Sequence, residues 1–331
     1  MNRKNSKKSV LKRVFGKYPA LFLLTALLAV MLSACGGSGG EKKLKVVATV
    51  FPLYDWAREV TGGNADIELT LLEDSGADLH SYQPTAADMA KIASCDLFIY
   101  VGGESDEWTE DALKASALNP GRITLDLMEL LGDRLLEEED KEGMQSSGEE
   151  EEKENDEHIW LSLKNARLCT EAISEALERL DPAGKDAFAK NAADYCTRLE
   201  TLRLAYAEAA AQAATKTLLF GDRFPFRYLT EEMGLDYFAA FSGCSAESEA
   251  SFETVVFLAN KVDELGLKVI MKTESGDGRI AETIRQASRA KDQKILTLDS
   301  LQAVTAARVK AGETYLKIME SNLEVLKEAL R

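Results

Sequence analysis

A long segment without helix-breaking residues lies in the middle of the 331-residue chain. From Gly184 to Ala214 there is no proline and no further glycine, and strong helix formers dominate. The pair Asp181-Pro182 precedes it as a helix start signal, because proline suits the first turn. These 31 residues, if helical, would extend about 46 Å, more than a small domain needs. The segment 181–214 is therefore predicted to be a rigid linker helix between two lobes.

Short apolar runs alternate with helical patterns on both sides of this segment. Strands are predicted at residues 44–51, 67–72, 97–101, 123–125, 217–220, 237–241, 269–271 and 295–298. Helices are predicted at residues 54–61, 85–93, 109–115, 226–233, 252–265, 279–290 and 307–330. Such alternation is typical of βαβ units with a parallel sheet. The predicted fold class is α/β, with two lobes, 44–180 and 215–331, each containing a mostly parallel four-stranded sheet flanked by helices.

The first 34 residues differ from the rest of the chain. They contain seven basic residues and no acid, with an apolar run at 19–32, and this layout is typical of a secretion signal. Residues 32–35 (LSAC) resemble a bacterial lipobox, in which the cysteine, here Cys35, becomes lipidated. Residues 35–43 are rich in glycine and suit a flexible tether. We expect a protein anchored by lipid to the extracytoplasmic face of the cell membrane; the alternative is an ordinary cleavage site with a chance cysteine.

The acidic character of the chain excludes some partners. The formal net charge is −16, and loss of the seven N-terminal basic residues leaves the remainder near −23. Nucleic acids and anionic lipid surfaces favour basic patches, so neither is expected as a partner. Residues 137–157 hold twelve acids and two lysines without apolar periodicity, which predicts a solvated, mobile loop. The functional alternative is a loop that gathers cations beside a metal site.

Four cysteines follow Cys35, namely Cys95, Cys169, Cys196 and Cys244. An even number in an exported protein allows disulfides. Cys169 and Cys196 both fall on predicted helices, and we expect these two to pair. The alternative is four free thiols that act as small buried apolar groups. Because no CxxC pair occurs, a thiolate metal site is not expected.

The chain has only two histidines, His80 and His158. Both are predicted at loop edges near strand ends, where open α/β sheets bind ligands. His80 lies in GADLHSYQPT (76–85), between a strand and a helix, and His158 lies in DEHIW (156–160), where the acidic segment ends. Taken alone, each is more often a surface or core residue, and their separation is too large for a local metal motif.

Together these segments resemble the metal-binding lipoproteins of zinc and manganese ABC importers. The resemblance covers essentially the whole chain after the signal. The segments that carry it are VATVFPLY (47–54), GADLHSYQPT (76–85), YVGGESDEW (100–108), HIWLSLKNA (158–166), TYL (314–316) and NL (322–323). The family's architecture, two α/β lobes joined by a long helix, agrees with the fold predicted above.

The resemblance also implies a metal between the lobes, held by His80 and His158 and by two residues of the second lobe. The acid after the last predicted strand is Asp299. The remaining position, usually histidine or glutamate, falls on Arg223, which does not ligate because it keeps its proton. The substitutes considered for that place are Asp222, then Glu274 or water.

Two imidazoles with carboxylates suit either zinc or manganese. We expect Zn²⁺ as the transported ligand, with Mn²⁺ as the alternative. The implied function is to capture the metal and deliver it to the membrane permease of an ABC importer, as a monomer and not as an enzyme. The sequence contains no HExxH or Walker A motif. A metal-dependent hydrolase and a metal-dependent surface adhesin are the other functions considered.

Overall fold

The computed structural model describes residues 43–331, except positions 77, 116–118, 146–153 and 246–248. The predicted signal segment 1–34, Cys35 and almost all of the predicted tether therefore lie outside the described residues. Residues 43–331 form one compact unit. In the part of the chain that the structure describes, no helix is both long enough and apolar enough to cross a bilayer.

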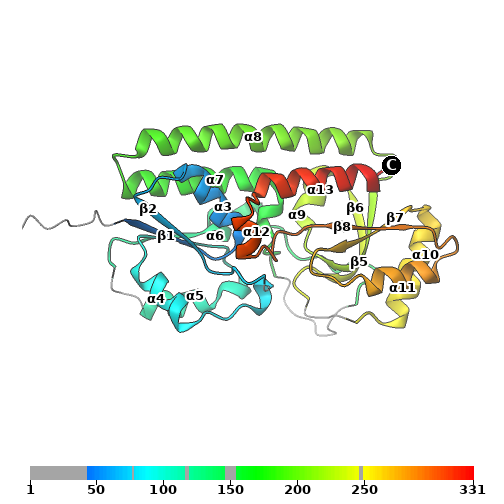
Figure 1. The fold of residues 1–331 in the computed structure, drawn as a ribbon. Coiled ribbons are helices and arrows are strands. Elements are labelled where there is room, and N and C mark those ends of the chain that lie inside the picture. The colour runs from blue at the N-terminus through cyan, green and yellow to red at the C-terminus, as the bar shows by residue number, and fades with distance from the viewer. Residues whose placement is uncertain (1–42, 77, 116–118, 146–153, 246–248) are drawn as a thin grey trace, which may run out of the picture. The chain divides into compact units, whose positions relative to one another are not determined.

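The first sheet contains four parallel strands in the order β2-β1-β3-β4. Its strands are β1 (Leu44–Ala48), β2 (Ile67–Leu71), β3 (Leu97–Tyr100) and β4 (Ile123–Asp126). The accompanying helices are α3 (Phe51–Thr61), α4 (Ala86–Ser94), α5 (Trp108–Ala115), α6 (Leu127–Leu131) and α7 (Leu163–Leu180). Most residues of the central strands β1 and β3 are buried, as expected for strands covered on both faces. We call this sheet and its helices the N-lobe (Figure 1).

The second sheet repeats the same topology, in the order β6-β5-β7-β8. Its strands are β5 (Thr217–Phe224), β6 (Asp236–Ser242), β7 (Val269–Thr273) and β8 (Lys294–Leu298). The helices are α9 (Arg227–Met233), α10 (Phe252–Leu265), α11 (Arg279–Ala287), α12 (Ala306–Lys310) and α13 (Tyr315–Ala329). We call this part the C-lobe. The single helix predicted at 307–330 is in fact two, because Gly312 adopts the left-handed region (φ +88°) between them.

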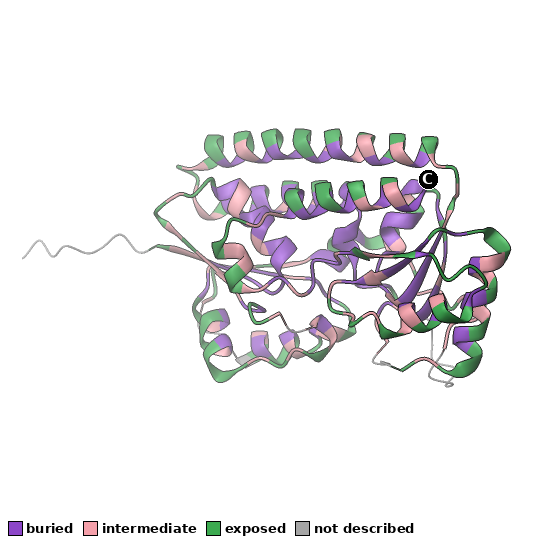
Figure 2. Cartoon of the chain, turned by 45° about the vertical axis from the view of Figure 1, so that its right-hand side comes forward, coloured by how far each residue is buried: buried purple, intermediate pink, exposed green. Residues whose placement is uncertain are grey.

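The predicted linker helix is α8 (Lys185–Gln212). It packs along α7, α3 and α13, and it forms the outer helical layer at the top of Figure 1. Its inner face is buried and its outer face is exposed (Figure 2). One hydrophobic core runs through both lobes and includes Trp160 from the first and Phe220 from the second. The predicted fold class, two parallel four-stranded sheets with a long helix, is confirmed.

The predicted disulfide between Cys169 and Cys196 is wrong, because every cysteine after position 42 is a free thiol. The two residues lie on the neighbouring helices α7 and α8. The Cys196 thiol, however, approaches the carbonyl oxygen of Arg167 at 3.8 Å, and Cys169 is fully buried in the core. Each sulfur therefore packs as a small apolar group.

The acidic segment 137–157 is also more ordered at its ends than a solvated loop would be. Its two described ends pair through an antiparallel bridge between Glu137 and Asn155. The backbone N–H of Gln145 donates to the carbonyl of Ala240 in β6 at 3.0 Å. Glu157 is only 3% exposed. The ends of the segment are thus fixed against the C-lobe, and its last residues enter the protein interior.

Candidate metal centre

His80 lies on a single helical turn, η1 (Leu79–Ser81), that follows β2. Asp78 caps this turn, since its Oδ1 accepts from the backbone N–H of His80 at 3.1 Å. The Nδ1 atom of His80 lies 2.7 Å from Ser105 Oγ and 3.4 Å from Glu157 Oε2. Its Nε2 atom is buried and has no hydrogen-bond partner. This nitrogen therefore remains free to bind a ligand.

His158 immediately precedes a second short turn, η4 (Ile159–Leu161). Asp156 Oδ1 accepts from the backbone N–H of His158 at 2.8 Å and lies 2.9 Å from its Nδ1. The hydroxyl of Tyr228 donates to the carbonyl of Asp156 at 2.8 Å, which fixes this turn to α9. His158 is 0% exposed, and its Nε2 has no partner. An imidazole held by a carboxylate at one nitrogen and free at the other is the arrangement expected of a metal ligand.

The two imidazoles meet in the interior and are joined by a third donor. The rings of His80 and His158 are edge to face, with centroids 5.3 Å apart. Cys244 follows β6, and one ligand atom from each of the three residues lies within 4.8 Å of the others. Among residues whose positions are described, this is the one group of three or more such donors. It combines two N-lobe residues with one C-lobe residue.

Two glycines allow these segments to approach each other. A Cβ atom on Gly243 would lie 3.2 Å from Cε1 of His158, so the turn after β6 approaches the ring closely. A Cβ on Gly103 (φ +80°) would lie 2.4 Å from Oε1 of Glu157. The same oxygen accepts from the N–H of Ser105 at 2.8 Å. The glycine turn after β3 thus makes room for the Glu157 carboxylate. This carboxylate fixes Ser105, whose hydroxyl contacts Nδ1 of His80.

Two of the predicted carboxylate ligands are bound by protein donors instead. Asp299 accepts from the Arg308 guanidinium at 2.8 Å. Glu274 accepts from both the N–H and the hydroxyl of Ser300, each at 2.7 Å. Neither belongs to the group formed by the histidines and the thiol. Both acids order the loop after β8.

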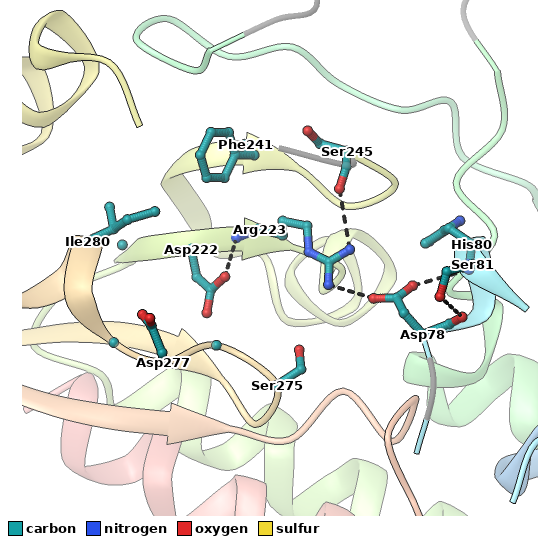
Figure 3. A pocket seen from close by; sticks show the side chains of 13 residues that line it. Asp78, His80, Ser81, Asp222, Arg223, Phe241, Ser245, Ser275, Asp277 and Ile280 are labelled. Atoms are coloured by element: carbon teal, nitrogen blue, oxygen red, sulfur yellow. Dashed lines mark hydrogen bonds and ion pairs between the residues drawn. The ribbon is translucent and has the colours of Figure 1, made fainter. Parts of the chain in front are cut away.

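Asp222 and Arg223 lie where β5 becomes irregular. Asp222 accepts from the N–H and the hydroxyl of Thr273, each at 2.9 Å. Arg223 donates to Asp78 Oδ2 at 2.5 Å and to the carbonyl of Ser245 at 3.3 Å (Figure 3). Burial opposes ionisation of Asp78, but the guanidinium outweighs it and holds the pKa of that carboxyl below its usual range. The residue at the expected ligand position therefore links the two lobes through an ion pair.

Two cavities open onto His80. One, of about 470 Å³, lies between the ion pair of Asp78 and Arg223 and the loop after β7 (Figure 3). The other, of about 440 Å³, also reaches Cys244. Five glutamates line this second cavity: Glu104, Glu107, Glu138, Glu154 and Glu157. A cleft lined by one sign of charge concentrates counter-ions, so the second cavity is suited to admit a cation.

The two imidazoles differ in how readily they protonate. Burial, followed by the neighbouring His158, lowers the pKa of His80 to about 4, so His80 is neutral at physiological pH. Burial also disfavours the charged form of His158, but Asp156 outweighs it and raises the pKa of His158 above its ordinary value. A metal at Nε2 of His158 therefore competes with a proton.

This fold has known counterparts. The profile of the family described as zinc-uptake complex component A periplasmic (ZnuA) matches residues 46–329. The chain belongs to the ZnuA family. This agrees with the resemblance seen in the sequence, which named the metal-binding lipoproteins of zinc and manganese importers.

Individual ZnuA relatives match over nearly the whole chain. The zinc-binding lipoprotein AdcA of Streptococcus pneumoniae is 32% identical over 311 residues, covering 92% of this chain and 60% of that protein. The high-affinity zinc uptake system protein ZnuA of Bacillus subtilis is 28% identical over 329 residues, which cover 96% of this chain and 99% of that protein. The chain thus spans about three fifths of the pneumococcal relative's length. The crystal structure of the Zn(II)-bound ZnuA-like domain of Streptococcus pneumoniae AdcA matches with a TM-score of 0.69 and 30% identity. The match covers 87% of this chain and 99% of that domain.

Cys244 and Asp156 lie beside the two histidines but are not among the residues that the sequence predicts for the site. The absence of CxxC led to the expectation that no thiolate would face a metal. A single cysteine at the carboxyl end of a parallel strand was the signal that was available, because that edge is where ligands bind. For Asp156, the signal was its position two residues before His158, which suits a side chain that accepts from the backbone N–H.

Replacing Asp156 with asparagine tests this carboxylate as the support of His158. The amide still accepts a hydrogen bond but loses the charge that favours a basic, correctly oriented imidazole. We expect zinc affinity, measured by calorimetric titration, to fall about tenfold to a hundredfold. Asp133→Asn is the matched control, since Asp133 is an exposed acid elsewhere on the N-lobe. Equal zinc affinities of Asp156→Asn and Asp133→Asn would show that Asp156 does not support zinc binding.

Proposed function

We propose that the protein captures zinc outside the cytoplasmic membrane and delivers it to the permease of an ABC importer, with manganese as the alternative cargo. The observation that carries the proposal is the pair of imidazoles of His80 and His158, whose Nε2 atoms are both buried. Each is held at Nδ1 and free at Nε2. Burying two unpaired nitrogens is unfavourable unless a ligand satisfies them. Membership of a zinc-uptake family supports the same conclusion.

Capture takes place in two successive steps, each carried out by residues of this chain. The glutamate-lined cavity concentrates the cation beside His80. The free Nε2 atoms then bind the ion, and Asp156 stabilises the coordinated ring of His158. Because one core runs through both lobes, closure is local to the loops that carry the donors rather than a wide hinge motion. A lipid on Cys35 would keep the carrier close to its permease.

Calorimetric titration of the metal-stripped protein tests the proposal directly. We expect one zinc ion per chain with a nanomolar or lower dissociation constant, corresponding to about −12 kcal/mol. In cells, deletion of the gene should lower zinc accumulation in zinc-poor medium, and the intact gene should restore it. Weak binding of several ions, lost when the glutamates of segment 137–157 are replaced, would overturn the proposal, since the acidic surface would then be the only binder.

A further inference from the structure

The two histidines both come from the N-lobe, and the site also needs a ligand from the C-lobe. A metal held between the lobes needs at least one ligand from the C-lobe. The two C-lobe positions of the family pattern and the two substitutes considered for them are all engaged: Arg223 with Asp78, Asp299 with Arg308, Asp222 with Thr273, and Glu274 with Ser300. Recruiting any of them would break hydrogen bonds that order the loops after β5, β7 or β8.

Cys244 is placed differently from these residues. It lies at the carboxyl end of β6, and its backbone N–H donates to Glu138 Oε1 at 3.0 Å. Its sulfur belongs to the group of donor atoms, all within 4.8 Å of one another, that includes both histidines. His158 is completely buried, and its Nε2 atom has no hydrogen-bond partner. A buried donor without a partner beside the thiol is an independent sign that a ligand belongs there.

The distances suit a metal after a small closure. Zinc binds imidazole nitrogen at ~2.0–2.1 Å and thiolate sulfur at ~2.3 Å, so tetrahedral donors lie roughly 3.3–3.7 Å apart. The present donors lie within 4.8 Å, and contraction by about 1 Å would bring them to that spacing. Gly243 permits this movement, because it has no side chain between the turn and the ring of His158.

We infer that Cys244 supplies the C-lobe ligand as a thiolate, and that this thiolate makes the site select zinc over manganese. The inference rests on the proposed function, since it assigns the cargo site. In the metal-free protein, burial and then Glu138 raise the pKa of the Cys244 thiol. A bound divalent cation reverses this balance, because its charge deprotonates a coordinating thiol. Thiolate favours zinc, whereas manganese prefers oxygen ligands. Water or a nearby glutamate completes the coordination.

Cobalt substitution and zinc affinity test the inference together. The Co²⁺ form of the wild-type protein should show a thiolate-to-cobalt charge-transfer band, and Cys244→Ser should lose it. Zinc affinity of Cys244→Ser should fall about tenfold to a hundredfold, and its preference for zinc over manganese should narrow. Cys196→Ser is the matched control, because Cys196 lies on α8 away from the donors, and it should keep both properties.

Alkylation of the unmodified protein provides a second measurement that does not depend on a variant's folding. Zinc should protect Cys244 from iodoacetamide, as read by mass spectrometry. A cobalt band that persists in Cys244→Ser, unchanged zinc affinity, or alkylation unaffected by zinc would overturn the thiolate assignment. If His158→Ala abolishes zinc binding while Cys244→Ser does not, the transport proposal stands and only the thiolate ligand falls. Absence of tight zinc binding by the wild type would contradict both.

Discussion

Replacing His158 with alanine is expected to weaken zinc binding by at least about a hundredfold. Zinc held by four protein ligands gains about 10–16 kcal/mol, so one ligand contributes on the order of 3 kcal/mol. Each 1.4 kcal/mol corresponds to about tenfold in affinity. The loss is increased here because Asp156, itself 2% exposed, is left without the imidazole. Competition with a fluorescent zinc chelator measures affinities of this size.

Asp299→Asn is the matched comparison for that experiment. The family pattern makes Asp299 a ligand, whereas in this structure Arg308 and the N–H of Leu301 bind its oxygens at 2.8 and 2.9 Å. We therefore expect Asp299→Asn to leave zinc affinity nearly unchanged. A loss at Asp299 as large as at His158 would show that the acid leaves Arg308 to bind the metal. Wild-type affinity in His158→Ala would contradict the site itself.

Replacing Trp160 with alanine is expected to destabilise the protein by about 3–5 kcal/mol, the usual cost of emptying a large buried site. Trp160 is 0% exposed. Its Nε1 donates to the carbonyl of Ser300 at 2.8 Å, and its own carbonyl accepts from the Tyr315 hydroxyl at 2.6 Å. The variant loses the hydrogen bond from the indole to Ser300 of the C-lobe and the packing around the indole ring.

Denaturant unfolding, followed by circular dichroism, measures this cost as a change in the free energy of unfolding. Phe252→Ala is the control, because Phe252 is 85% exposed on α10, and truncation there should change stability little. The indole ring also packs edge to face on His158, with centroids 5.3 Å apart. Zinc affinity should therefore fall as well in Trp160→Ala. A stability change as small as that of Phe252→Ala would show that the lobes are not joined through this residue.

Arg223 illustrates how the site departs from the family pattern while the two lobes remain joined. A permanent cation does not ligate a metal, yet it pairs with Asp78, the residue that caps the turn of His80. The ion pair thus fixes the loop of one ligand to the C-lobe. With that position filled by a cation, a different C-lobe donor is required. Within the described chain, Cys244 is the C-lobe residue whose ligand atom lies within 4.8 Å of one ring nitrogen of each histidine.

Much of the fold could be predicted from local patterns. The apolar runs predicted at 44–51 and 97–101 contain the central strands β1 and β3, because burial on both faces requires continuous hydrophobicity. The first run was predicted too long, since β1 ends at Ala48 and Phe51 already begins α3. The run without glycine or proline became α8, because propensity accumulates over a long segment. The boundary at Gly312 was missed because one glycine has a small cost in a helix and its left-handed conformation depends on the surrounding turns.

The sequence by itself determined the two parallel sheets, the long helix and the pair of histidines at strand ends, since each follows from periodicity or from position along the chain. Only the tertiary structure decided which further groups face those histidines. Asp222, Glu274 and Asp299 are suitable ligands by residue type, but neighbouring hydroxyls, amides and a guanidinium already bind them. The absence of a CxxC pair argues against a thiolate ligand, yet Cys244 meets residues 86 and 164 positions earlier. Competition among donors for one carboxylate, and proximity between distant segments, are properties of packing in three dimensions.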